Sequence, residues 1–274
     1  MQRKDILDLN FTKPAIMGIL NVTPDSFYSN SRFSTLDEAV KATERMLKEG
    51  ADIIDIGGMS SRPGAKFVAY DEEKERVIPV LTELRKRFPD IIISIDTFRS
   101  KIADISLDNG ADIINDISAG NLDEDILDVV AGYDVPYIFM HMKGIPENMQ
   151  NDPKYENVVS DVLKFMFKKI RFLKSKGIEK LIADPGFGFG KTIDDNYKLL
   201  KDLDVFKILE IPVLVGISRK SMLYKVLDIT PEESLNATTA MHSIALLKGA
   251  KILRVHDVKE AVEVVALMEK LKNA

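Results

Sequence analysis

Short aliphatic runs recur along the chain, and most of them end in a polar side chain followed by a break. Ile91-Ile92-Ile93-Ser94-Ile95 ends in Asp96, and Leu181-Ile182-Ala183 ends in Asp184. A run this short and apolar is typical of a strand buried on both faces, as in a parallel sheet. The pattern predicts eight strands, near 15–20, 53–57, 91–96, 113–117, 136–141, 181–184, 212–216 and 251–255.

Amphipathic segments separate these runs and predict helices, among them 35–49, 71–87, 99–109, 154–175, 231–248 and 257–272. In the segment 154–175 one face carries Val158, Val162, Phe165, Met166 and Ile170. That spacing is typical of a helix that packs on a core. A glycine closes several of these segments just before an aliphatic run, at Gly50, Gly110, Gly177 and Gly249. Because glycine tolerates the left-handed conformation that ends a helix, helix, cap and strand recur as one unit.

Eight strand–helix units in 274 residues fit a closed (β/α)8 TIM barrel of the α/β class. The alternative is an open, doubly wound sheet, whose polar strand ends would gather at one switch point. Here the polar strand ends are spread along the whole chain, which favours the barrel. Since no low-complexity linker divides the sequence, residues 1–274 are predicted to form a single domain.

Composition narrows the classes of function. The net charge of −5 without a basic stripe argues against a nucleic-acid partner. No aliphatic run approaches the roughly 18 residues of a membrane span, and the N-terminal segment lacks the apolar core of a signal peptide. The sequence contains no cysteine, so disulfides and thiolate chemistry are excluded. These features predict a cytoplasmic protein with small-molecule substrates.

Three polar strand ends suggest a binding site. Asp96, Asn115 and Asp184 each end a different predicted strand. In a barrel such positions meet at one mouth, where catalytic residues gather. An ionised carboxylate accepts two parallel donors, so this set matches a heterocycle with adjacent ring and amino N–H groups. Each residue taken alone could equally be a cap or a buried hydrogen-bond anchor.

A basic corner follows the last two strands. Lys220 lies in the segment 216–221. Arg254 stands at the end of the eighth strand, and His256 follows two residues later. Loops after strands seven and eight are a recurrent phosphate site in TIM barrels. Arginine offers a planar fork to phosphate oxygens and lysine a point charge. A surface cluster of salt bridges is the alternative, although it leaves the surrounding glycine and serines unexplained.

The segment from Gly186 to Lys191 resembles a phosphate loop but fails the pattern. A Walker A motif needs a glycine where Pro185 stands, and the dinucleotide fingerprint needs a different glycine spacing. A glycine-rich turn that lets the backbone approach something flat is the better interpretation. A merely tight loop is the alternative.

The remaining candidate features are two loops and the histidines. The segments 21–31 and 57–64 are rich in loop residues and are candidate lids at the mouth. His141 has a structural role at least as readily as a catalytic one, and His242 falls inside a helix. No histidine or cysteine spacing suits a transition metal, so any metal is a hard ion such as Mg²⁺.

Taken together, these motifs closely resemble the dihydropteroate synthase family across about residues 14–270. The motifs are Asn21-Val-Thr-Pro-Asp-Ser-Phe27, Ser61-Arg62-Pro63-Gly64, Asp96-Thr97, Asn115-Asp116, Met140-His141-Met142, the run from Asp184 to Lys191, Ser218-Arg-Lys-Ser221 and Arg254-Val-His-Asp257. The resemblance implies a homodimeric TIM barrel that uses Mg²⁺ and is a sulfonamide target. The implied reaction is a transferase step of folate synthesis. It joins 6-hydroxymethyl-7,8-dihydropterin pyrophosphate to p-aminobenzoate and releases pyrophosphate.

The resemblance also assigns roles to residues. By resemblance, Asp96, Lys220, Arg254 and His256 are catalytic, with Arg254 stacking on the pterin and His256 at the pyrophosphate. Substrate is bound by Asn115, Asp184, Met140, Phe189, Phe27, Ser61, Arg62, Pro63 and Ser221, of which Phe27, Ser61, Arg62, Pro63 and Ser221 shape the p-aminobenzoate pocket. Asn21 is the implied Mg²⁺ ligand. Asp96 and Asp184 are expected to stabilise a pterin-methyl cation once pyrophosphate leaves.

The chain departs from the family pattern in two loops. Tyr28-Ser29-Asn30-Ser31 stands where many relatives have Ser-Asp-Gly-Gly, and Met59 replaces a glutamate. These changes put in question how the loops engage Mg²⁺, p-aminobenzoate or a sulfonamide. Two other functions share the pterin-holding residues. One is a pterin-binding methyltransferase, which needs no pyrophosphate site, and the other is a paralogue that binds pterin without turnover.

Overall fold

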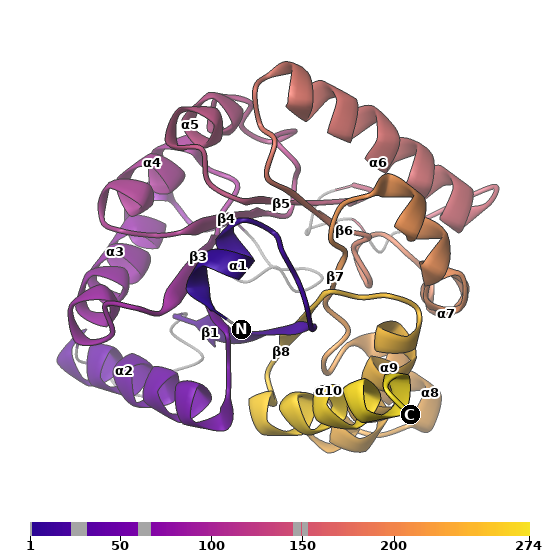
Figure 1. The fold of residues 1–274 in the computed structure, drawn as a ribbon. Coiled ribbons are helices and arrows are strands. Elements are labelled where there is room, and N and C mark those ends of the chain that lie inside the picture. The colour runs from indigo at the N-terminus through magenta and orange to yellow at the C-terminus, as the bar shows by residue number, and fades with distance from the viewer. Residues whose placement is uncertain (1, 23–31, 60–66, 145–148, 150–152) are drawn as a thin grey trace.

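The computed structural model describes residues 2–22, 32–59, 67–144, 149 and 153–274. Parallel strands form a barrel at its centre (Figure 1). They are β1 (Ala15–Asn21), β2 (Ile53–Gly57), β3 (Ile92–Asp96), β4 (Ile113–Asp116), β5 (Tyr137–Met140), β6 (Leu181–Asp184), β7 (Leu214–Val215) and β8 (Ile252–Val255). All eight predicted strands are confirmed, with ends that differ by at most two residues.

The order of the strands distinguishes a barrel from an open sheet. The sheet runs β6-β5-β4-β3-β2-β1-β8-β7, so the first and last strands of the chain are neighbours. A parallel bridge between Ala183 and Val213 joins its two edges, and Ala183 N donates to Pro212 O at 2.9 Å. Pro212 has no N–H to continue the ladder, so β7 is shorter than the predicted 212–216. The closed TIM barrel is therefore confirmed.

Except for the first, which lies over the middle of the barrel, the helices surround it in chain order (Figure 1). They are α1 (Arg3–Leu7), α2 (Arg32–Glu49), α3 (Tyr70–Arg87), α4 (Ser100–Asp108), α5 (Asp125–Tyr133), α6 (Val158–Ser175), α7 (Ile193–Lys201), α8 (Ser221–Leu227), α9 (Leu235–Leu247) and α10 (Val258–Lys272), with the 3-10 helices η2 (Leu203–Leu209) and η3 (Glu232–Ser234). Among the described residues, no helix is long and apolar enough to cross a membrane.

Local capping accounts for where the helices begin and end. The predicted helix 154–175 begins only at Val158, because the Asn157 side chain accepts from Ser160 N at 3.0 Å and caps it. The four predicted cap glycines all have positive φ, at 102°, 91°, 84° and 107° in chain order. The repeated unit of helix, glycine and strand is thus confirmed.

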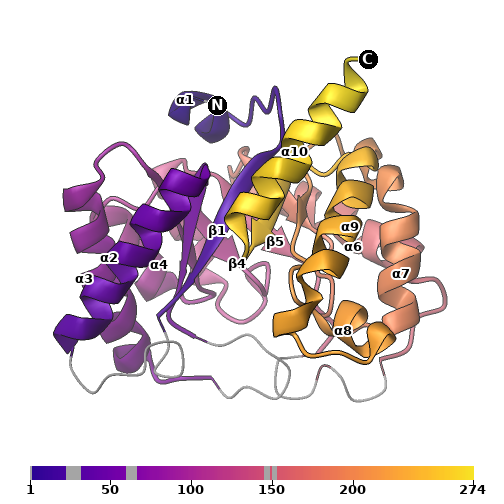
Figure 2. The same cartoon turned by 90° about the horizontal axis from the view of Figure 1, so that it is seen from below.

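The alternation of side chains along the strands separates two cores. Outward residues such as Ile54, Ile93 and Leu253 pack under the helices. Inward residues near the strand starts, among them Ile53, Ile92 and Ile252, fill one end of the barrel. The short helix α1 covers that end with Ile6 (Figures 1 and 2). The polar inward positions lie farther along the strands, at the opposite end.

Candidate active site

Strand register brings four of the site positions together. Asn21 pairs with Gly57, Gly57 with Asp96, and Asp96 with Asn115, so they lie in one row across four strands. A Cβ on Gly57 would lie 3.5 Å from Asn21 Oδ1 and 3.7 Å from Asp96 Cβ, so glycine leaves room between the two side chains. On the other side of the barrel, Met140 pairs with Asp184. The register confirms that Asp96 and Asn115 lie side by side at the strand ends, as predicted.

Arg254 links the row to a carboxylate beneath it. On β1, Met17 pairs with Arg254, and Ile19, two residues farther along, pairs with Asp55. The backbone of Arg254 therefore lies one layer below that of Asp55. From that lower layer its guanidinium rises past Asp55, donating from Nε to Asp55 Oδ2 at 2.6 Å and from Nη2 to Asp96 Oδ2 at 2.7 Å. Burial alone lowers the pKa of Arg254, but the charges of Asp55 and Asp96 more than offset it and raise that pKa. Arg254 is therefore a fixed cation.

Asp55 is a site residue that sequence analysis missed. Its side chain is 0% exposed, and its Oδ2 also accepts from Asn115 Nδ2 at 3.2 Å. This contact commits the amide of Asn115 to Asp55 and leaves Asn115 Oδ1 as an acceptor for a ligand. The Oδ1 of Asp55 has no hydrogen-bond partner among the described residues, so one buried acceptor awaits a ligand or water. The signal was a carboxylate inside Ile53-Ile54-Asp55-Ile56.

Lys220 faces the same space from the loop after β7. Its Nζ donates to Phe187 O and lies 4.6 Å from the centre of the Phe189 ring. A Cβ on Gly216 would lie 3.9 Å from this Nζ and 3.8 Å from Arg254 Cβ, so the bare glycine opens the space between the two cations. Burial lowers the pKa of Lys220 to about 8, while Asp184 counteracts the shift. The basic corner is partly buried, unlike a surface cluster of salt bridges.

Asp184 begins the glycine-rich turn. Its Oδ1 accepts from Gly186 N at 2.7 Å, and burial raises its pKa. A Cβ on Gly186 would meet His141 O at 2.0 Å, and one on Gly190 would meet Lys143 O at 2.2 Å. These two glycines are thus required by the backbone of the neighbouring loop rather than by a ligand. At these two positions the structure supports the alternative of a tight loop, and approach of the turn to a flat ligand stays a prediction.

Asp96 gives the site its pH dependence. Burial raises the pKa of Asp96 to about 7, against the opposing charge of Arg254. Donors of a bound heterocycle favour the ionised carboxylate. The site is therefore competent above the pKa of Asp96 and below that of Lys220.

We accordingly expect a bell-shaped pH dependence of kcat/KM, with its maximum between pH 7 and 8. The acid limb reflects protonation of Asp96 and the basic limb loss of the Lys220 proton. Initial rates at low substrate concentration, measured across pH, test this. In Lys220→Arg the part of the basic limb that belongs to Lys220 should vanish, because arginine does not titrate in this range. A profile that is flat between about pH 6 and 9 would contradict the assignment.

Apolar side chains complete the mouth. Met140 and Phe189 form a buried cluster with Ile117 and Met149, which offers a wall to a flat ligand. Ser221 begins α8 directly after Lys220.

The loops after β7 and β8 are tied to each other beside this wall. Arg219 Nε donates to Asp257 Oδ2 at 3.0 Å, and Ser218 Oγ lies 3.0 Å from His256 Nδ1. These contacts connect the loop after β7, which carries Lys220, to the loop after β8, which carries His256.

Several other predictions have mixed outcomes. Burial lowers the pKa of His141 to about 3 and that of His242 to about 4, so both are neutral and fit structural roles.

Met59 is buried. Two arginines hold the ends of its loop: Arg76 donates to Gly58 O at 2.8 Å, and Arg99 donates to Val68 O at 2.5 Å. Four predicted residues, Phe27, Ser61, Arg62 and Pro63, lie outside the described residues.

The donor set at the mouth limits the kind of metal. Within the described part of the chain, no three His, Cys, Asp or Glu residues are grouped to hold an ion. Asn21, at the end of β1, offers one amide oxygen. One neutral oxygen suits Mg²⁺ that is held mainly by diphosphate oxygens and water, and it does not suit an ion caged by protein.

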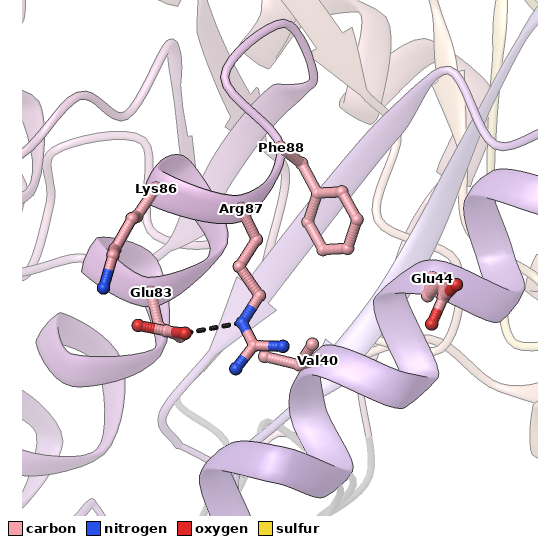
Figure 3. A pocket seen from close by; sticks show the side chains of 6 residues that line it. All are labelled: Val40, Glu44, Glu83, Lys86, Arg87 and Phe88. Carbon is pink, nitrogen blue, oxygen red and sulfur yellow. Dashed lines mark hydrogen bonds and ion pairs between the residues drawn. The ribbon is translucent and has the colours of Figure 1, made fainter.

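A hollow lies on the outside of the barrel, between α2 and α3 (Figure 3). It is lined by Val40, Glu44, Glu83, Lys86, Arg87 and Phe88. Glu83 and Arg87 pair there at 2.5 Å on an exposed helix face. Because no strand end contributes to it, we place the active site at the mouth.

Comparison with known proteins identifies the class. The model of the pterin binding enzyme family matches residues 17–256. The dihydropteroate synthase of Escherichia coli (strain K12) is 44% identical over 97% of this chain and 94% of its own. Two dihydropteroate synthase structures superpose closely. The Yersinia pestis enzyme in a sulfonamide drug complex has a TM-score of 0.91 at 42% identity, covering 96% of both chains. The Xanthomonas albilineans enzyme with 4-aminobenzoic acid has a TM-score of 0.91 at 38% identity, covering 98% of both.

The fold, the site and these matches place the chain in one class: it belongs to the pterin binding enzyme family. Within that family, the relative and the two structures described above, matched across nearly their whole length, are dihydropteroate synthases. The resemblance seen in the sequence motifs is thereby confirmed.

Proposed function

We propose that this chain catalyses dihydropteroate synthesis. It would condense 6-hydroxymethyl-7,8-dihydropterin pyrophosphate with p-aminobenzoate to give 7,8-dihydropteroate and pyrophosphate. The observation that carries the proposal is the convergence of Asp96, Asn115 and Asp184 from three strands on the cations Arg254 and Lys220. Carboxylates and an amide oxygen suit the donor edge of a pterin, and the two cations suit its diphosphate.

The pterin would lie between the apolar wall and the polar row. Asp184 and Asn115 Oδ1 would accept its ring and amino N–H groups, which fixes the orientation of the ring. Met140 and Phe189 would cover one face. Arg254, held by two carboxylates, would present its guanidinium plane to the ring and its edge to the diphosphate.

The reaction would follow a dissociative course. The bond between the methylene carbon and the diphosphate oxygen breaks, and its electron pair leaves with pyrophosphate. Lys220, Arg254 and His256 would stabilise the departing charge. Asp96 and Asp184 would stabilise the cation left on the pterin. The p-aminobenzoate nitrogen, neutral near pH 7, attacks the methylene carbon without a strong base, forms the C–N bond and then releases one proton to solvent or to the departing pyrophosphate. Positioning carries most of the remaining work.

Three further features belong to the same proposal. Mg²⁺, with Asn21 as its protein ligand, would supply Lewis-acid stabilisation of the diphosphate.

A homodimer is supported by exposed leucines on neighbouring helices, Leu227 on α8, Leu247 on α9 and Leu267 on α10. The p-aminobenzoate pocket would also admit sulfonamides, and the absence of cysteine is compatible with a cytoplasmic enzyme.

The test is incubation of the protein with the pterin pyrophosphate, p-aminobenzoate and Mg²⁺. We expect pyrophosphate and 7,8-dihydropteroate to form in equal amounts. A coupled phosphate assay measures the pyrophosphate, and chromatography measures the 7,8-dihydropteroate. Pterin binding without product would instead identify a paralogue that lacks turnover. Transfer of a methyl group from a folate, with no need for diphosphate, would identify a methyltransferase.

A further inference from the structure

Lys191 is a buried cation to which the reaction proposed above gives no task. Its side chain is 2% exposed, and its Nζ donates to Gly186 O at 2.7 Å and to Phe189 O at 3.2 Å. It also lies 3.0 Å from His141 Nδ1 and 3.3 Å from His141 O. The amine thus joins both ends of the glycine-rich turn to the end of β5.

The protonated form of Lys191 matches these partners. His141 is neutral, so its Nδ1 can accept a hydrogen bond while Nε2 carries the proton. An ammonium has three hydrogens for the three shortest contacts, whereas a neutral amine would turn a lone pair toward an acceptor. Burial lowers the pKa of Lys191 to about 7, and Asp184 opposes that shift.

The turn that Lys191 holds carries two groups of the pterin site. Phe187 O accepts from Lys220 Nζ, and the Phe189 ring lies 4.6 Å from the same atom. Gly188 N donates to Asn196 Oδ1 at 2.7 Å, which anchors the turn to α7. Three glycines with positive φ make this segment intrinsically pliable, so its shape depends on such contacts.

We propose that Lys191 is a positioning residue of the pterin site. Its buried ammonium holds the glycine-rich turn in the shape that sets Phe187 O and the Phe189 ring against Lys220. The inference rests on the proposed function, which it deepens by naming a residue that acts on the pterin without touching it. These contacts also explain why Lys191 does not act as the lysine of a phosphate loop, since all the hydrogens of its ammonium are donated to protein acceptors.

The test compares Lys191→Met, which keeps the length of the side chain and removes the ammonium, with Lys198→Met, which removes an exposed lysine on α7. Calorimetric titration with the pterin pyrophosphate and Mg²⁺ should show Kd raised about tenfold or more in Lys191→Met, as expected for a lost charge-assisted contact, and unchanged in Lys198→Met. The KM for p-aminobenzoate should stay within about twofold of wild type, because that substrate binds away from the turn. Hydrogen exchange of the 186–190 amides should accelerate, while the β3 and β4 amides stay protected.

Three outcomes in the variants would overturn the inference while leaving the proposed function intact. One is wild-type pterin affinity in Lys191→Met, and another is lost affinity with the turn amides still protected as in wild type. If Lys191→Met does not fold, His141→Leu serves as the second variant. It keeps the lysine, removes the ring acceptor and should weaken pterin binding by a smaller factor than loss of the ammonium. Wild-type affinity in His141→Leu would then be the third. A wild-type protein that binds no pterin pyrophosphate would overturn the proposed function itself, and this inference with it.

Discussion

Lys220→Ala is expected to abolish turnover, lowering kcat by about a thousandfold or more, the upper range for removing one preorganised donor at a developing charge. The expectation follows from the position of the amine. The amine is half-buried against the Phe189 ring with Asp184 and Arg254 nearby, and its removal leaves only Arg254 and His256 to stabilise the departing diphosphate. Single-turnover measurements with both substrates saturating test this directly.

The control for Lys220→Ala is Lys225→Ala, which removes an exposed lysine on α8, the helix that begins directly after Lys220. That variant should retain wild-type kcat. Circular dichroism should show both variants folded, because removing a buried amine also removes its desolvation cost. Wild-type rates in folded Lys220→Ala would remove the residue from the mechanism.

Asp184→Asn is expected to weaken binding of the pterin pyrophosphate by about 1.5–3 kcal/mol, the usual worth of a hydrogen bond to a charged group. The change keeps the size of the side chain but replaces one acceptor oxygen with a donor, which would face the donor edge of the pterin. Because Asp184 also supports the charge of Lys220, kcat should fall as well.

Calorimetric titration measures the affinity of Asp184→Asn, with the exposed Asp194→Asn as a matched control for charge on the neighbouring segment. The control should bind the pterin as wild type does. Equal affinity in both variants would show that Asp184 does not contact the pterin.

Much of the fold follows from the sequence because the period of apolar residues differs between strands and helices. The runs at 53–57 and 181–184 match β2 and β6 residue for residue. The helix α1 was not predicted, since five residues carry too little periodicity to be recognised. Its role comes from tertiary packing, as Ile6 covers the open end of the barrel.

The site was predictable where its residues end strands, and unpredictable where it depends on register. Asp96, Asn115 and Asp184 stand at visible breaks, so their meeting followed from the barrel alone. Asp55 lies inside a strand, and only the stagger of β8 against β1 shows that Arg254 reaches it. Lys191 has the sequence context of a phosphate ligand, and only coordinates reveal that its amine is enclosed by carbonyl groups.

The most direct test of the account is a crystal structure of the protein with the pterin pyrophosphate or a stable analogue. We predict that the ring lies at the mouth of the barrel, with its donor edge within hydrogen-bonding distance of Asp184 and Asn115 and its diphosphate beside Lys220 and Arg254. A ring bound elsewhere, for example in the hollow between α2 and α3, with those four side chains touching no ligand atom, would contradict the account.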